Sequence, residues 1–153
     1  MLLWERWRKR RWIRCAVIVF VPFLLLYVLA MAPAWIHNHQ LDGLADRFLS
    51  HPLPPETDFY DDEIQGSIAI RPGSNSNHCD YRLRFNLETE LSVDEVVRYY
   101  RSAKIPGIDG NEVDVIAWTS PDMQPHPDNF NQLSIILEVQ DYGHGADWDT
   151  RCW

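Results

Sequence analysis

An uninterrupted run of uncharged residues, 15–36, constrains the fold of this 153-residue chain more than any other feature. A helix rises about 1.5 Å per residue, so the run covers about 33 Å. The hydrocarbon core of a bilayer is about 30 Å thick, and the run is long enough to span it with some tilt. Trp12 and Trp35 lie near its ends, where indole rings favour the headgroup region. The run predicts a transmembrane helix over residues 15–36, and Pro22 is expected to kink it.

The charges in front of this run predict its orientation. Only one acidic residue, Glu5, accompanies six basic ones: Arg6, Arg8, Lys9, Arg10, Arg11 and Arg14. Because basic segments are retained in the cytoplasm, residues 1–14 should be a cytoplasmic segment. Everything after Ile36 should then be extracytoplasmic, periplasmic or extracellular, on a single-pass protein of the cell membrane.

A cleaved signal peptide is the competing interpretation of the same segment. Residues 30–32 and 32–34 both have the small-x-small pattern of a cleavage site. However, the apolar run is longer than the roughly 7–15 residues of a signal sequence. A cut after the first pattern would also place Pro33 directly behind the cleaved bond. A retained signal anchor is therefore the preferred interpretation.

Charge is distributed unevenly along the chain, whose formal net charge is −8. Beyond residue 36 lie eight of the 14 basic and 21 of the 22 acidic residues, a difference of −13. Such a segment repels nucleic-acid phosphates, so no nucleic-acid partner is expected. A basic patch on a protein partner, or a cation, would be complementary to it, although net charge alone also keeps a small domain soluble.

The cysteines predict one covalent link. Cys15 lies in the apolar run, which leaves Cys79 and Cys152 in the translocated part. Two cysteines in an oxidising compartment indicate a disulfide. Zinc is the weaker alternative, because no second close pair or ordered histidine spacing accompanies them.

Hydrophobic spacing divides the translocated part into three segments. Residues 37–50 carry an apolar stripe at i, i+3, i+4 and i+7, formed by Leu41, Leu44, Ala45 and Phe48, which predicts a juxtamembrane amphipathic helix. Residues 51–63 contain three prolines and a cluster of acidic residues, and are expected to form an extended linker without a packed element. The extracytoplasmic domain should therefore comprise residues 64–153.

Within that domain the pattern predicts the order β-β-α-β-β. Alternating apolar residues indicate strands at 64–71, 79–88, 113–120 and 133–140. Between the second and third strands, Ser92 and Glu95 form a capping box at the start of a helix that ends before Pro106. A four-stranded antiparallel or mixed sheet with one main helix on one face, an α+β fold of two layers, is the expected architecture. This topology brings Cys79 and Cys152 to the same end of the sheet, in agreement with the disulfide.

No stretch has a catalytic or cofactor-binding signature, so an enzyme is not expected and no cofactor is predicted. The C-terminal Asp141, His144, Asp147 and Asp149 lack the pattern of a calcium loop, and a solvated tail is the simpler interpretation. His37 and His39 are two residues apart and should point to different faces of a helix. No metal site is therefore predicted.

One face of the sheet is the candidate for interaction with a partner. Arg82 and Arg84 project from the outward face of the second strand, and Glu138 from that of the fourth. If the two strands are neighbours, Arg–Glu pairs form; if not, the arginines could bind an acidic partner. Trp148 and Trp153 either cover part of this face or serve as interface anchors.

The function expected is a non-catalytic interaction module that binds a protein partner. A domain that binds a small ligand or a cation is the alternative, and an envelope enzyme comes third.

Overall fold

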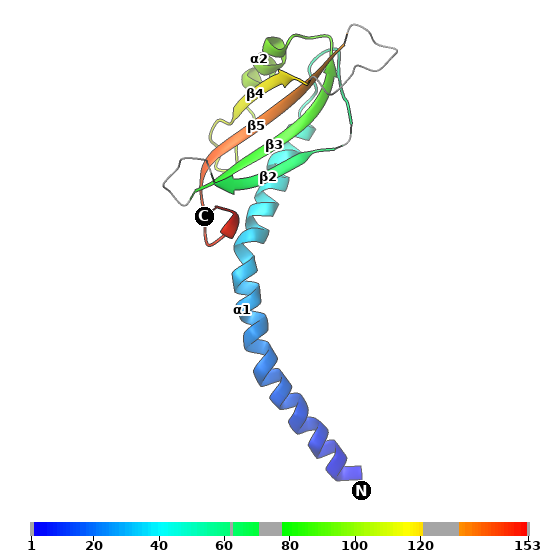
Figure 1. Ribbon diagram of the computed structural model, residues 1–153, viewed down its shortest axis with the longest axis vertical. Coiled ribbons are helices and arrows are strands. Elements are labelled where there is room, and N and C mark those ends of the chain that lie inside the picture. The colour runs from blue at the N-terminus through cyan, green and yellow to red at the C-terminus, as the bar shows by residue number, and fades with distance from the viewer. Residues whose placement is uncertain (1, 62, 71–77, 121–131, 153) are drawn as a thin grey trace.

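The computed structural model describes residues 2–61, 63–70, 78–120 and 132–152 and has an α+β fold (Figure 1). A long N-terminal helix and one further helix accompany an open antiparallel sheet. In chain order the elements are α1 Leu2–Ser50, β1 Thr57–Phe59, β2 Gln65–Ile70, β3 His78–Thr89, α2 Val93–Ala103, β4 Asp114–Thr119, β5 Leu133–Gly145 and the short 3-10 helix η1 Thr150–Cys152.

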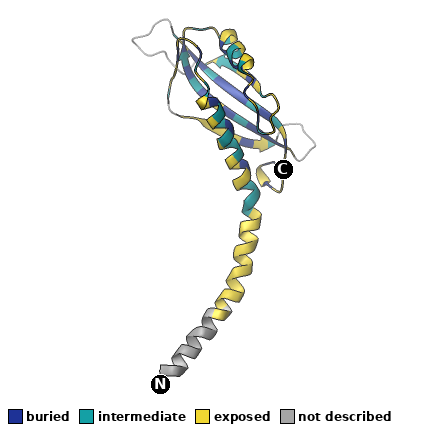
Figure 2. Ribbon diagram, turned by 180° about the vertical axis from the view of Figure 1, so that it is seen from behind, coloured by how far each residue is buried: buried dark blue, intermediate teal, exposed yellow. Residues whose placement is uncertain are grey.

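Helix α1 is continuous through the two segments that the sequence divides. It includes Pro22 and Pro33 without ending and is bowed over its length (Figure 1). From Ala16 the helix is long and apolar enough to cross a membrane. Its last four turns lie against the sheet, so the predicted juxtamembrane helix is the end of the same helix rather than a separate element. Figure 2 shows the change from exposed to buried residues along it.

The sheet has five strands, one more than predicted, and all its pairs are antiparallel. β3 and β5 form its centre, and β4 lies at the outer edge of β5. β1 and β2 lie end to end along the other edge of β3, where Thr57 pairs with Thr89 and Ile70 with Cys79. The additional strand, β1, lies within residues 51–63. The proline-rich composition of this segment concealed it, because only three residues pair and just one of them, Thr57, is buried.

Both helices cover the same face of the sheet. The alternation along β3 turns Tyr81, Leu83, Phe85 and Leu87 toward them, as the sequence predicts. Phe48 of α1 lies between two rings, with centroid distances of 6.3 Å to Phe85 and 6.1 Å to Tyr100 of α2. α1 approaches β2 so closely that a Cβ at Gly66 would lie 2.9 Å from Leu41 Cδ2. The helix end is therefore part of the hydrophobic core.

The predicted start of α2 is confirmed. The carboxylate of Glu95 accepts a hydrogen bond from the backbone N–H of Ser92 at 2.9 Å, which closes the capping box. Val96 and Tyr100 are buried against the sheet, and burial raises the pKa of Tyr100 to about 12. The helix ends at Lys104, which adopts a left-handed conformation with φ of 50°.

If the end of α1 belongs to the core, truncating Phe48 should destabilise the domain strongly. Phe48 is 4% exposed and the adjacent Leu49 is 41% exposed, so the two residues form a matched pair. We expect Phe48→Ala to lower the free energy of unfolding by about 3–5 kcal/mol, because the cavity leaves two aromatic neighbours without contact. Leu49→Ala should cost far less. Urea unfolding of the full-length protein in detergent measures both, and equal effects would contradict the packing.

Candidate functional site

The sheet face turned away from the helices is the candidate interaction surface, called here the open face. Its central residues are Arg82, Arg84, Ile116, Trp118, Glu138 and Gln140. Because β3 and β5 are neighbours, Arg84 lies directly across from Glu138, and Arg82 across from Gln140. β4 adds Ile116 beside Glu138. Among the described residues no helix packs on this face, which is turned to the viewer in Figure 1.

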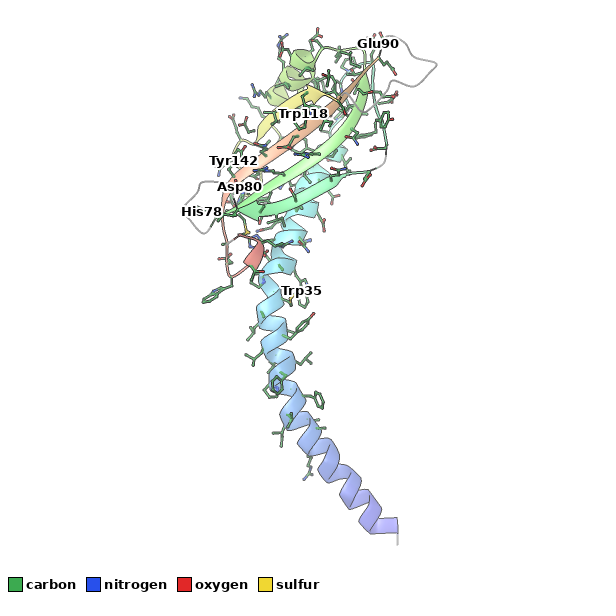
Figure 3. All side chains as sticks on the ribbon, viewed as in Figure 1. Trp35, His78, Asp80, Glu90, Trp118 and Tyr142 are labelled. Atoms are coloured by element: carbon green, nitrogen blue, oxygen red, sulfur yellow. A yellow bond between two sulfur atoms is a disulfide. The ribbon has the colours of Figure 1, made fainter. Side chains whose placement is uncertain are left out.

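An ion pair between a half-exposed arginine and a buried carboxylate lies at the middle of the open face. Arg84 Nε donates to Glu138 Oε2 at 2.5 Å; the Arg84 side chain is 46% exposed and that of Glu138 only 3%. Gln140 also donates to the Glu138 carboxylate. The Arg84 guanidinium lies 5.6 Å from the centroid of the Trp118 ring, within the range of a cation–π contact. Figure 3 shows Trp118 on this face, at the edge strand β4.

Of the two alternatives that the sequence left open, neighbouring strands with an Arg–Glu pair are the one that forms. Arg84 is therefore committed to Glu138, whereas Arg82 forms no ion pair with the described residues. Trp148 is 79% exposed and does not cover the open face. Trp153 lies outside the described residues. Trp118 was not predicted, because three consecutive apolar residues hide the alternation of β4; the pairing with β5 reveals it.

A second set of polar residues gathers where α1 leaves the domain, around the disulfide. Cys79 and Cys152 are joined as predicted, with a Cα–Cα distance of 5.0 Å. The buried His37 of α1 has a ring nitrogen within 4.8 Å of both sulfurs. A thiolate pair with this imidazole would offer three soft ligands, but the disulfide bond occupies both sulfurs. The group thus brings α1 together with the start of β3 and with η1.

His37 also contacts the base of β3. The Tyr81 hydroxyl lies 2.5 Å from His37 Nδ1 and donates to Gln40 Oε1 at 2.7 Å. A phenol has only one proton to donate, and in Tyr81 this proton is directed at Gln40 Oε1. The hydrogen bond between Tyr81 and His37 is therefore donated by the Nδ1–H of His37 and accepted by the phenol oxygen. Burial, followed by the charges of nearby aspartates, raises the pKa of Tyr81 above its usual value. The contact is a hydrogen-bond network between helix and sheet.

Beside Tyr81, the imidazole of His144 lies between two carboxylates. Its Nε2 is 2.9 Å from Asp141 Oδ1 and its Nδ1 is 3.0 Å from Asp109 Oδ2. The contact with Asp141 raises the pKa of His144. Burial by itself would raise the pKa of Asp141, but the ion pair with His144 and the hydrogen bond from the Ile108 N–H lower it overall. The predicted solvated tail is therefore wrong in this part, because Asp141 and His144 belong to β5 and are buried.

The chain end is tied directly to α1. Arg151 holds the buried Asp149 with Nε and Nη2, the shortest distance being 2.6 Å. The same guanidinium donates to Asn38 Oδ1 at 2.8 Å and to the backbone carbonyl of Ala34 at 3.2 Å. The hydrogen bonds from Arg151 hold the pKa of Asp149 below its usual value. Asp149 thus orients the arginine that grips the helix.

Comparison of the chain with protein-family models, with curated proteins and with solved structures gives no match.

The two arginines of the open face provide a matched test of the Arg84–Glu138 ion pair. We expect Arg84→Gln to lower the free energy of unfolding by about 1–3 kcal/mol, because it leaves the Glu138 carboxylate buried without its cation. Arg82→Gln, two residues along the same strand, should change it by less than about 0.5 kcal/mol. Denaturant unfolding of both variants checks this; a loss for Arg82→Gln as large as that for Arg84→Gln would refute the assignment.

His144 should make stability depend on pH. Its pKa is raised above 6.5 in the folded state, so its contribution is complete below pH 6.5 and is lost as the pH rises through the folded value. The folded protein should therefore lose stability as the pH rises above 6.5 and through the raised pKa of His144. In His144→Asn this loss should be smaller, whereas the exposed His39→Asn should retain it. Melting temperatures of the three proteins across this range give the comparison.

Proposed function

We propose that this chain is a single-pass membrane protein with a cytoplasmic N-terminus, residues 1–14. Its extracytoplasmic domain is a non-catalytic module that binds a protein partner through the open face. The basic cluster before the apolar run and the acidic domain after it support this orientation. The buried and paired state of Asp141, His144 and Asp149 supports a structural rather than a catalytic role for the C-terminal polar residues.

The observation that carries the proposal is the continuity of α1 from the apolar segment into the core. Leu44 and Phe48 are buried in the same helix whose earlier turns, around Phe20 and Leu24, are exposed. A flexible tether would let the domain turn freely, whereas this helix holds the domain at one angle to the apolar segment. Such rigidity favours an adaptor, because a preoriented surface loses less freedom on binding.

The open face has the chemistry of a protein-binding surface. Trp118 and Ile116 offer apolar area, and Arg82 offers donors. Trp and Arg are enriched at interface hot spots. In Figure 1 the helix runs down the page while this face is turned to the viewer. The face therefore looks sideways from the helix axis, and a partner that projects from the same membrane could reach it.

A small-ligand site is the second candidate. A pocket of about 250 Å³ lies between the end of α1 and the β1–β2 edge. It is lined by Leu49, Phe59, Ile64 and Phe85 with the carboxylates of Asp61 and Glu63, a set that suits a small apolar cation. Ligand sites typically enclose about 300–1,000 Å³, so this pocket is smaller than usual and the interaction module is preferred.

Site-specific photocrosslinking in intact cells tests the adaptor proposal. A benzophenone amino acid at Ile116, on the open face, should form one discrete adduct with a partner protein. The same probe at Arg98, exposed on α2 in the opposite layer, should not. Adding Arg82→Glu should reduce the Ile116 adduct about tenfold or more, since losing an interface arginine commonly costs about 2 kcal/mol.

The outcomes separate the two candidates. Adducts of equal yield at both positions, or an Ile116 adduct unaffected by Arg82→Glu, would overturn binding through the open face. A compound that raises the melting temperature of the protein, and fails to do so in Phe59→Ala, would instead support the pocket.

A further inference from the structure

The turn that precedes η1, residues 146–149, carries a tryptophan that the domain does not bury. Trp148 is 79% exposed, the highest value among the described large apolar side chains. Its φ is 72° and that of Asp147 is 42°, so two consecutive residues adopt the left-handed conformation. Bulky residues rarely do so, and such a conformation persists only where surrounding bonds impose it.

Bonds that can hold Asp147 and Trp148 in the left-handed conformation are present on both sides of the turn. The Asp149 N–H donates to the Ala146 carbonyl at 2.7 Å, which closes the turn, and Ala146 is buried. Immediately beyond, Asp149 and Arg151 form their ion pair and Cys152 is held by the disulfide. The tail is thus fixed at several points while the indole of Trp148 is directed outward.

The turn lies beside α1, and its level along the helix axis determines which environment Trp148 meets. Arg151 donates to the carbonyl of Ala34, which lies within the apolar run and three residues before the first buried residue of α1, His37. Trp35, the next residue, is 49% exposed. Figure 3 shows Trp35 on α1 close to the point where η1 meets the helix. The tail therefore reaches α1 at the level where the apolar run ends.

We propose that the turn at residues 146–149 is a membrane-contact element, and that Trp148 inserts into the headgroup region of the bilayer spanned by α1. Indole rings prefer this region because one edge is polar and the body apolar. Trp148 and Trp35 would then mark the same interface. Asp147 is exposed and acidic, so the contact depends on the aromatic ring and suits zwitterionic lipid. The inference rests on the proposed membrane insertion of α1.

Fluorine NMR of the full-length protein in phosphatidylcholine nanodiscs tests this contact. The seven tryptophans are replaced biosynthetically by 5-fluorotryptophan, and the resonances of positions 35, 118 and 148 are assigned from Trp→Phe variants. A small fraction of lipid carries a gadolinium chelate on its headgroup, which broadens nearby resonances. Trp118, on the open face, is the negative control, and Trp35 is the control for insertion.

We expect the resonances of Trp148 and Trp35 to be lost on addition of the gadolinium lipid and that of Trp118 to persist. A Trp148 resonance that persists while that of Trp35 is lost would overturn the membrane contact and leave the anchor intact. Persistence of both would overturn the insertion of α1 itself, and the inference with it.

Discussion

The fold depends on one constraint, the packing of the last four turns of α1 against the sheet. An α-helix satisfies its backbone hydrogen bonds internally, so it can pass from a lipid environment into a protein core without a break. Here the same helix presents an exposed apolar surface around Phe20 and Leu24, and a one-sided buried stripe at Leu44 and Phe48. Without this stripe, the inner sheet face around Phe85 would be covered only by α2.

The base of the domain reinforces this packing with three kinds of interaction. The disulfide joins β3 to the chain end, the His37–Tyr81 hydrogen bond joins α1 to β3, and Arg151 joins the chain end to α1. Together these interactions connect α1, β3 and the C-terminal tail to one another. Charged groups within it are paired, which offsets the desolvation that burial of Asp149 would otherwise cost.

Much of this architecture could be predicted from local patterns. The period-two alternation of β3 and the capping box of α2 follow from residue spacing, and the structure contains both. The pairing of Cys79 with Cys152 follows from their being the two cysteines outside the apolar run, and the structure contains it too. β1 could not be predicted, because its pairing depends on β3 rather than on its own residues. The role of His37 was hidden for the same reason: its partner Tyr81 is 44 residues away, and only the packing of α1 on the sheet brings them together.

The continuity of α1 also determines how the open face could communicate with the membrane. Because Leu44 and Phe48 face the sheet, rotation of the helix about its axis must rotate the domain with it. Arg151 opposes sliding of the helix along the domain, since it donates hydrogen bonds to Asn38 and Ala34, one turn apart on α1. A partner bound at Trp118 would therefore hold the apolar segment in one rotational orientation. Conversely, contacts of that segment with another membrane helix would select the direction in which the open face is presented.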